Sequence, residues 1–351
     1  MIKLNRQIIT GIRASQSGED LHKYLMSAIM LEHSTIPPYL TAMFSLKQGT
    51  NQRIGQLIRT IVVEEMLHMT IASNILIAVG GHPEINTKGF VPNYPGPLPM
   101  GIVSDLTVGI EAFSIRLVKD IFMSIEQPED EVLVHQLAQG AEPQFATIGE
   151  FYNAIQKQIE KLGQHIFVQP NAPPQVVASQ WFPPGKLFPI TGPASACRAI
   201  DIVKLEGEGT SSTPFQAPGD PAHFYKFQEI AAGRELTQTA GGFADDGPPI
   251  LFDPSGVWPL RPNCKIADFQ LGTQARTRIE RFAYSYSSLL NALHQTFNGD
   301  PDKLDSAIGM MYDLRVQAAA LIQTDVEDGS GMTVGPSFEF VDTQGGMQSG
   351  A

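Results

Sequence analysis

Residues 61–81 read IVVEEMLHMTIASNILIAVGG and place acidic residues and a histidine inside an otherwise apolar run. The apolar residues recur at helical spacing and the run ends in two glycines, which predicts one long helix from Asn51 to about Val79. Glu65 and His68 are three residues apart, so their side chains leave the helix on one face and can bind one ion. Because an unpaired charge is costly to bury, the segment predicts a metal site in a helical core.

The preceding segment predicts a second long helix. It extends from Asp20 to about Lys47 and contains LHKYLMSAIMLEHSTIPPYLTAMFSL, with Ser17 or Asp20 available as the N-terminal cap. Pro37 and Pro38 fall inside this helix and should kink it, because proline lacks the backbone donor and crowds the preceding turn.

Glu32 lies within the apolar part of the helix expected from Asp20 to about Lys47. A glutamate there, opposite Glu65 and His68, is half of the carboxylate pattern of two-metal four-helix bundles. A carboxylate with an imidazole suits iron, manganese or zinc. Two neighbours are interpreted differently: Glu64 should face solvent, and His33 should lie beside the ligands or at the surface.

The second half of the pattern needs a glutamate on a third helix and a carboxylate with a histidine on a fourth. Glu150 fits the first role within ATIGEFYNAIQKQIEKLG, a helix expected from about Gln144 to Gly163. The fourth helix is expected to be broken, because PASACRAIDIVKLEGEG ends in glycine and HFYKFQEIAAGRE resumes after a polar insertion. Its ligands would be Glu206 or Glu208 from the first piece and His223 from the second. Tyrosines 39, 152 and 225 would line the site or simply pack.

The remaining segments complete an all-α chain. A short helix is expected over residues 111–124, and two more over 273–297 and 302–324. The stretches 82–104, 164–192 and 235–272 are rich in proline and glycine and are expected to build a substrate pocket and lid. A short hairpin is expected in 235–272. We expect a metal-binding bundle over 1–235, with 236–351 packed on it in the same domain.

The composition limits the partners. Lysine plus arginine number 24 against 36 acidic residues, the net charge is −12, and the basic residues are scattered. This argues against nucleic acid or an anionic membrane as partner and leaves a small-molecule substrate, with a homo-oligomer compatible. The N-terminus lacks signal-peptide features and no uninterrupted apolar run reaches membrane-spanning length, so a cytoplasmic protein is expected. Cys197 and Cys264 are interpreted as ordinary thiols.

Several strings together resemble one family. They are LEHSTIPPYLTAMFSL, VVEEMLHMTIASNILIAVGGHP, TIGEFYNAI, the GEG around Glu208, HFYKF, VWPLRPN and AIGMMYDLRVQAAALI. They resemble the ferritin-like domain of the iminophenyl-pyruvate dimer synthases, which belong to bisindole pigment pathways such as those of violacein and rebeccamycin. The resemblance covers nearly the whole chain. It implies a ferritin-like four-helix bundle with metal ligands at Glu32, Glu65, His68, Glu150, Glu208 and His223.

The resemblance also implies an activity, the oxidative coupling of two imines derived from an aromatic amino acid, and haem association in some members. The expected function is therefore an oxygen-dependent oxidoreductase with two iron ions. The alternatives are an iron-handling protein and a metal-stabilised binding protein without catalysis. The fourth helix has no E-x-x-H, so one ion or an unequal pair is also open. Helical register favours Glu206 over Glu208, unless the helix breaks at Gly207.

Overall fold

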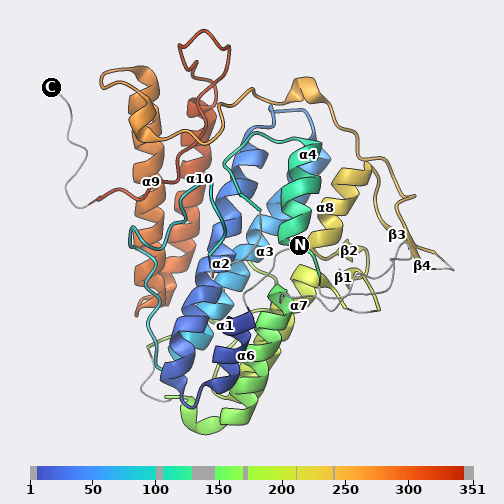
Figure 1. Ribbon diagram of the computed structural model, residues 1–351, viewed down its shortest axis with the longest axis vertical. Coiled ribbons are helices and arrows are strands. Elements are labelled where there is room, and N and C mark those ends of the chain that lie inside the picture. The colour runs from blue at the N-terminus through green and yellow to red at the C-terminus, as the bar shows by residue number, and fades with distance from the viewer. Residues whose placement is uncertain are drawn as a thin grey trace.

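The structure is a computed structural model that describes residues 6–99, 106–128, 147–168, 173–210, 212–239 and 242–343. Its centre is a pair of long helices, α2 (Gly18–Phe44) and α3 (Gln52–Ala78), which run side by side through the molecule (Figure 1). Ser17 caps α2 in a capping box with Asp20, so the first of the two expected caps is confirmed. The short helix α1 (Arg6–Ala14) packs near the start of α2.

The third and fourth positions of the bundle are each filled by two helical pieces. The third consists of a segment over 115–125 and then α6 (Ile148–Leu162). The first segment joins α4 (Ile115–Leu117), a π-helical turn (Val118–Phe122) and α5 (Met123–Ile125). The fourth consists of α7 (Pro193–Glu208) and α8 (His223–Ala232), so the expected break is confirmed.

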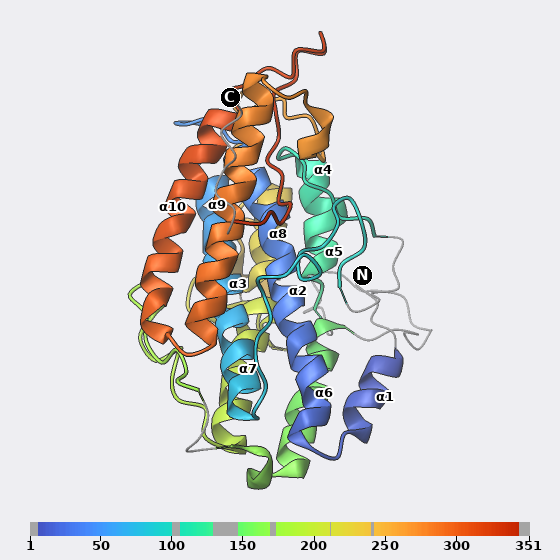
Figure 2. The same cartoon turned by 90° about the vertical axis from the view of Figure 1, so that its left-hand side faces the viewer.

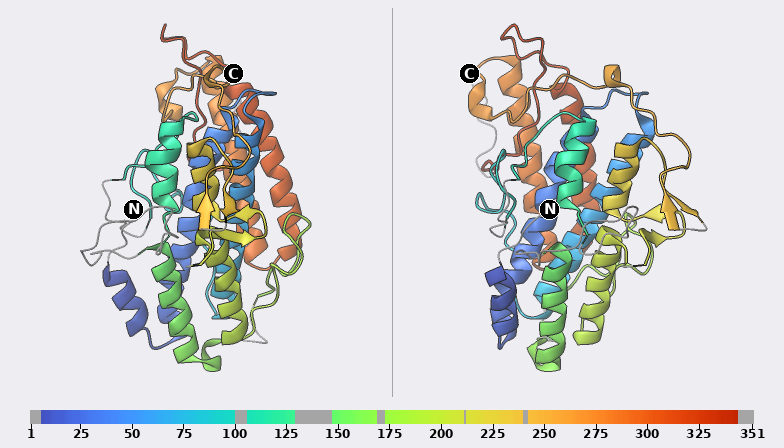
Figure 3. Two further views of the ribbon diagram at one scale, coloured as in Figure 1. Left: turned by 90° about the vertical axis from the view of Figure 1, so that its right-hand side faces the viewer. Right: turned by 45° about the vertical axis from the view of Figure 1, so that its right-hand side comes forward.

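The four pieces form two pairs. The π-helical turn and α5 pack on α8, and α6 packs on α7. Figures 2 and 3 show α4 and α8 toward one end of the bundle and α6 and α7 toward the other. The ends of all four pieces therefore meet beside α2 and α3 partway along the bundle.

The C-terminal part adds a helical hairpin, α9 (Gln274–Phe297) and α10 (Leu304–Leu321), which packs against α2 and α3 (Figure 2). Both expected helices are thus confirmed. Two small antiparallel hairpins pair β1 (Phe215–Ala217) with β2 (Asp220–Pro221) and β3 (Thr237–Thr239) with β4 (Gly242–Ala244). Single 3-10 turns occur at Gln164–Ile166, Pro254–Gly256, Ile266–Asp268 and Pro301–Lys303.

Helix α3 is the one helix of the described segments that is long and apolar enough to cross a membrane by composition. However, 83% of its most apolar window is buried inside the protein. This burial is typical of a core helix, and the polar residues that interrupt the apolar run lie in the core with it.

Helix α2 continues through Pro37 and Pro38. Because proline has no N–H, the carbonyl four residues earlier loses its helical partner. For Pro38 that carbonyl belongs to Ser34, and it accepts a hydrogen bond of 2.6 Å from the buried Tyr94 hydroxyl instead. A residue of the loop that follows α3 thus supplies the hydrogen bond that the α2 backbone lacks, close to Glu32.

We expect Tyr94→Phe to lower the free energy of unfolding by about 1–3 kcal/mol, because the buried Ser34 carbonyl loses its side-chain donor. Urea denaturation of Tyr94→Phe, Pro38→Ala and the double variant would measure it. In the Pro38→Ala variant a backbone N–H is again available to the Ser34 carbonyl, so the Tyr94 hydroxyl should matter much less in that background. Equal losses in both backgrounds would contradict this role of Tyr94.

Candidate metal centre

Glu32, Glu65 and His68 meet in the core between α2 and α3, as the sequence predicts. They are 5%, 2% and 2% exposed, respectively. Nδ1 of His68 lies 3.6 Å from Oε2 of Glu32. The Tyr152 hydroxyl of α6 donates a hydrogen bond to the other oxygen of Glu32.

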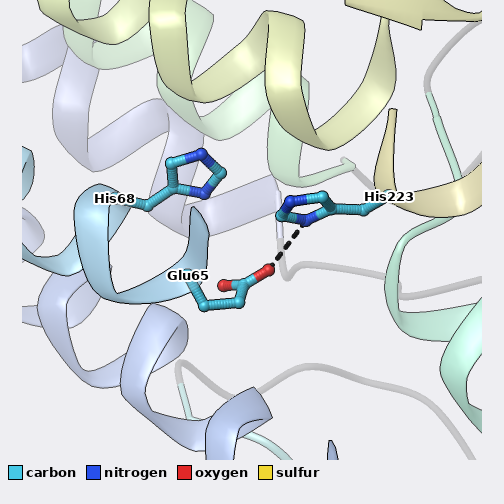
Figure 4. A group of neighbouring side chains, drawn as sticks. All are labelled: Glu65, His68 and His223. Carbon is cyan, nitrogen blue, oxygen red and sulfur yellow. Dashed lines mark ion pairs between the residues drawn. The ribbon is translucent and has the colours of Figure 1, made fainter. Parts of the chain in front are cut away.

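His223, the first residue of α8, joins them from the far side of the bundle. Its Nδ1 lies 2.9 Å from Oε1 of Glu65, as Figure 4 shows. The imidazole rings of His68 and His223 are stacked with their centroids 5.3 Å apart. One donor atom each from Glu65, His68 and His223 lies within 4.8 Å of the others. Glu65 therefore lies close to two histidines from different helices.

Glu126 is a third acidic member of this cluster, and the sequence reasoning missed it. It follows the last residue of α5, is 8% exposed, and places Oε2 3.5 Å from Nδ1 of His223. Its other oxygen accepts a hydrogen bond of 2.5 Å from the Tyr39 hydroxyl. The available signal was a glutamate directly after the apolar run IFMSI.

Glu150, expected in the cluster, lies elsewhere. Its carboxylate accepts a hydrogen bond of 3.0 Å from the Thr147 N–H, and its own N–H donates to the Thr147 hydroxyl. The predicted placement was wrong because α6 begins only at Ile148, so Glu150 occupies the helical position that closes a capping box. At the third position of the bundle, Glu126 supplies the carboxylate to the cluster instead.

The end of α7 separates Glu206 from Glu208. Glu206 is 2% exposed, and its Oε2 lies 2.9 Å from Nε2 of His68. Glu208 is half-buried at the edge of the site, where its carboxylate accepts a hydrogen bond of 2.8 Å from the Gly149 N–H. Helix α7 runs through to Glu208, so no break occurs at Gly207 and the helical register turns Glu206 to the core. The placement implied for Glu208 among the inner side chains is therefore corrected.

The opposite imidazole has a matching carboxylate. Nε2 of His223 donates to Glu64 at 3.0 Å, and Lys226 contacts the same oxygen at 2.9 Å. Lys226 is itself 1% exposed. The expectation that Glu64 faces solvent was wrong, since its side chain is 14% exposed. Charged hydrogen bonds to His223 and Lys226 offset its burial.

The two histidines are thus held in the same way. On one side Nε2 of His68 is bound by Glu206, which forms an ion pair of 2.6 Å with Lys186. On the other side Nε2 of His223 is bound by Glu64, which forms an ion pair with Lys226. In both cases Nε2 is engaged and Nδ1 is turned toward the inner carboxylates. Carboxylates that orient histidines in this way are typical of metal sites.

Four other expected neighbours can now be placed. Tyr39 and Tyr152 contact the carboxylates, as described above. Tyr225 is buried in a separate apolar cluster with Ala222 and Leu236. His33 is neither at the surface nor beside the ligands, because it is 3% exposed and its Nε2 lies 2.8 Å from the Tyr286 hydroxyl of α9.

Burial shapes the charges of the cluster. Burial, reinforced by the neighbouring Glu126, raises the pKa of Glu65 to about 8. Burial by itself would lower the pKa of His68, but hydrogen bonds to acidic neighbours, Glu206 first, outweigh it and raise this pKa to about 10. The close acidic neighbours of His223, Glu126 first, likewise raise its pKa against the effect of burial. Bound protons therefore offset the negative charge of the buried carboxylates, and a metal cation can replace these protons.

The hydrogen bonding of Nδ1 of His223 indicates whether these residues fit a metal ion. Nδ1 of His223 is buried and, within the described segments, makes no hydrogen bond of acceptable geometry, although the carboxylates of Glu65 and Glu126 lie close to it. A buried polar atom in this state requires an explanation, and a shared cation provides one. Imidazole and carboxylate donors suit iron, manganese and zinc. The donor set therefore fits a metal centre.

Comparisons with known proteins agree with this architecture. A family model described as ferritin-like matches residues 25–232. Dichlorochromopyrrolate synthase from Lentzea aerocolonigenes is 24% identical over 309 residues, covering 79% of this chain and 29% of that protein. The chain thus spans less than a third of that relative's length. A crystal structure of a ferritin-like protein from Caulobacter vibrioides has a TM-score of 0.61 at 22% identity, covering 90% of this chain and 97% of the other.

The family match includes the whole cluster. It begins before Glu32, ends after His223, and leaves out α9 and α10. It also spans more than half of the chain, and the fold of the solved structure agrees with it. The resemblance seen in the sequence motifs is confirmed, and this chain belongs to the ferritin-like family.

Proposed function

We propose that this protein is an oxygen-dependent oxidoreductase that holds two iron ions in the buried cluster and oxidises a small organic molecule. The observation that carries the proposal is the pair of histidines whose Nδ1 atoms turn toward the same carboxylates. Glu32, Glu65 and His68 would hold one ion. Glu65, Glu126 and His223 would hold the other, so Glu65 serves both.

Ferrous ions bound there would supply the electrons that reduce dioxygen. The surrounding side chains keep the ligands in place. Tyr39 and Tyr152 each donate a hydrogen bond to a carboxylate, Glu126 and Glu32 respectively, which restricts the rotation of these ligands. The near-complete burial of the cluster excludes bulk water from the ligands.

A pocket reaches the cluster at the level of the helix breaks. Its empty volume, including the part open to solvent, is about 470 Å³. Its outer lining comes from the ends of broken helices and comprises Gln127, Ile148, Gly149, Val203, Lys204, Gly207 and Glu208. An imine derived from an aromatic amino acid is the substrate class we propose. The family resemblance and the similarity to dichlorochromopyrrolate synthase support this choice.

The reaction can be tested directly. Anaerobic protein loaded with ferrous iron and mixed with oxygen should show a transient charge-transfer absorption in stopped-flow measurements. An aromatic amine or imino acid should make it decay faster and yield an oxidised product. Decay that is unaffected by a broad panel would favour iron handling, and the absence of any absorption change would favour a metal-stabilised protein without catalysis.

A matched pair of variants tests the ligand assignment. Glu126→Gln should weaken metal binding at least about tenfold, because an amide does not supply the ligand charge. Glu150→Gln should leave metal binding unchanged, since glutamine also closes a capping box. Metal analysis of protein purified without chelator, followed by titration with ferrous iron, measures both. Loss of metal in Glu150→Gln alone would refute the assignment.

A second pair tests the pocket as the route for substrate. A Cβ atom at Gly207 meets nothing within 4 Å, so Gly207→Trp should fold and narrow the entrance. We expect turnover of the substrate identified by the panel to fall about tenfold or more while the metal content is unchanged. Gly309→Trp in α10 is the control, because that glycine is also helical and equally open. Unchanged turnover in Gly207→Trp would exclude this route.

A further inference from the structure

A second cavity lies on the opposite side of the α2 and α3 pair from the metal centre. It is enclosed by these two helices, by the α9 and α10 hairpin and by Phe182. Figure 2 shows the hairpin standing against α2 and α3. Its empty volume, including the part open to solvent, is about 530 Å³. It shares no lining residue with the pocket at the metal centre.

The lining of this cavity is apolar except for His33, Thr70 and Tyr286. The Thr70 hydroxyl already donates to the Met66 carbonyl at 2.8 Å. The Tyr286 hydroxyl lies 2.8 Å from Nε2 of His33. Nδ1 of His33 is buried and has no hydrogen-bond partner within the described segments. Among the described residues, the lining therefore contains one buried side-chain polar atom that makes no hydrogen bond, Nδ1 of His33.

The number of protons on the His33 imidazole decides whether its Nδ1 is a hydrogen-bond donor or an acceptor. A neutral imidazole carries a single N–H. If Tyr286 donates its proton to Nε2, the N–H of His33 is on Nδ1 and one buried group is left unpaired. The reverse arrangement leaves two unpaired groups, the Tyr286 O–H and the Nδ1 lone pair. Since each unpaired buried group is destabilising, the first arrangement is favoured and Nδ1 is a hydrogen-bond donor.

We propose that this cavity binds a small, mostly apolar molecule with one neutral hydrogen-bond acceptor, such as a ketone carbonyl, which accepts from Nδ1 of His33. The apolar lining favours a ring, because Phe182, Phe297, Met66 and Met69 offer aromatic and thioether contacts. The half-buried Leu293 marks a side from which such a molecule can enter. The cavity is a site separate from the proposed oxidation at the metal centre.

Two compounds of nearly equal shape test the proposal. Acetophenone carries the carbonyl, whereas α-methylstyrene has a CH₂ group in its place. Protein labelled with ¹³C in its methionine methyl groups should show saturable NMR shifts with acetophenone at Met66, Met69 and Met311, which line the cavity. These signals can be assigned by single methionine-to-leucine variants. α-Methylstyrene should bind about tenfold more weakly, because it leaves the donor of His33 unpaired.

Variants separate the contributions of the cavity and the hydrogen bond. His33→Phe should abolish the preference for acetophenone, and Leu293→Trp should weaken both compounds by filling the entrance. Leu251→Trp, at a residue that is 79% exposed and does not line the cavity, should change neither. Equal affinity for the two compounds in the natural protein, or no saturable shifts up to the solubility limit, would overturn the proposal. Iron content measured in the same samples reports on the metal centre independently.

Discussion

The structure depends on a carboxylate buried beside a pair of stacked imidazoles. Glu65 is nearly inaccessible, its carboxylate lies next to His223, and His68 is close by. Acidic groups in a helical core are destabilising unless they are paired, so this contact requires histidines and further carboxylates in defined positions. Lys186 and Lys226 in turn compensate the negative charges of the carboxylates that bind the two histidines, Glu206 and Glu64 respectively. The cluster is therefore organised in layers around Glu65.

The helix breaks make this arrangement possible. An unbroken helix presents its side chains at fixed intervals along one face, whereas an end can deliver a residue at a new angle. Glu126 follows the end of one segment and His223 begins another, and both reach Glu65 from these ends. Gly149 contributes by its lack of a side chain, because a Cβ atom there would lie 2.5 Å from Glu208. The same ends line the pocket that leads to the cluster.

The two central helices present different residues on their two faces. Glu32 faces the candidate metal centre, while the adjacent His33 contacts Tyr286 of the C-terminal hairpin. Likewise Glu65 and His68 face one pocket, and Met66 and Met69 face the other. The hairpin lies outside the range of the family match, so it adds a second chamber to a ferritin-like core. Adjacent residues thus belong to separate sites because successive helical positions point in different directions.

The sequence by itself determined the helical class, the two central helices and the inward position of Glu32, Glu65 and His68, because spacing within one helix is a local property. It also indicated the break before His223 through the glycines and the polar insertion. Only the tertiary structure brought Glu126, rather than the expected Glu150, into the cluster and decided between Glu206 and Glu208. Those choices depend on which helix ends meet in space, and on whether a carboxylate is used by a local cap or by a partner far along the chain. The spacing of residues in the sequence does not specify contacts between distant helix ends, so the long-range half of the site could be identified only in the folded chain.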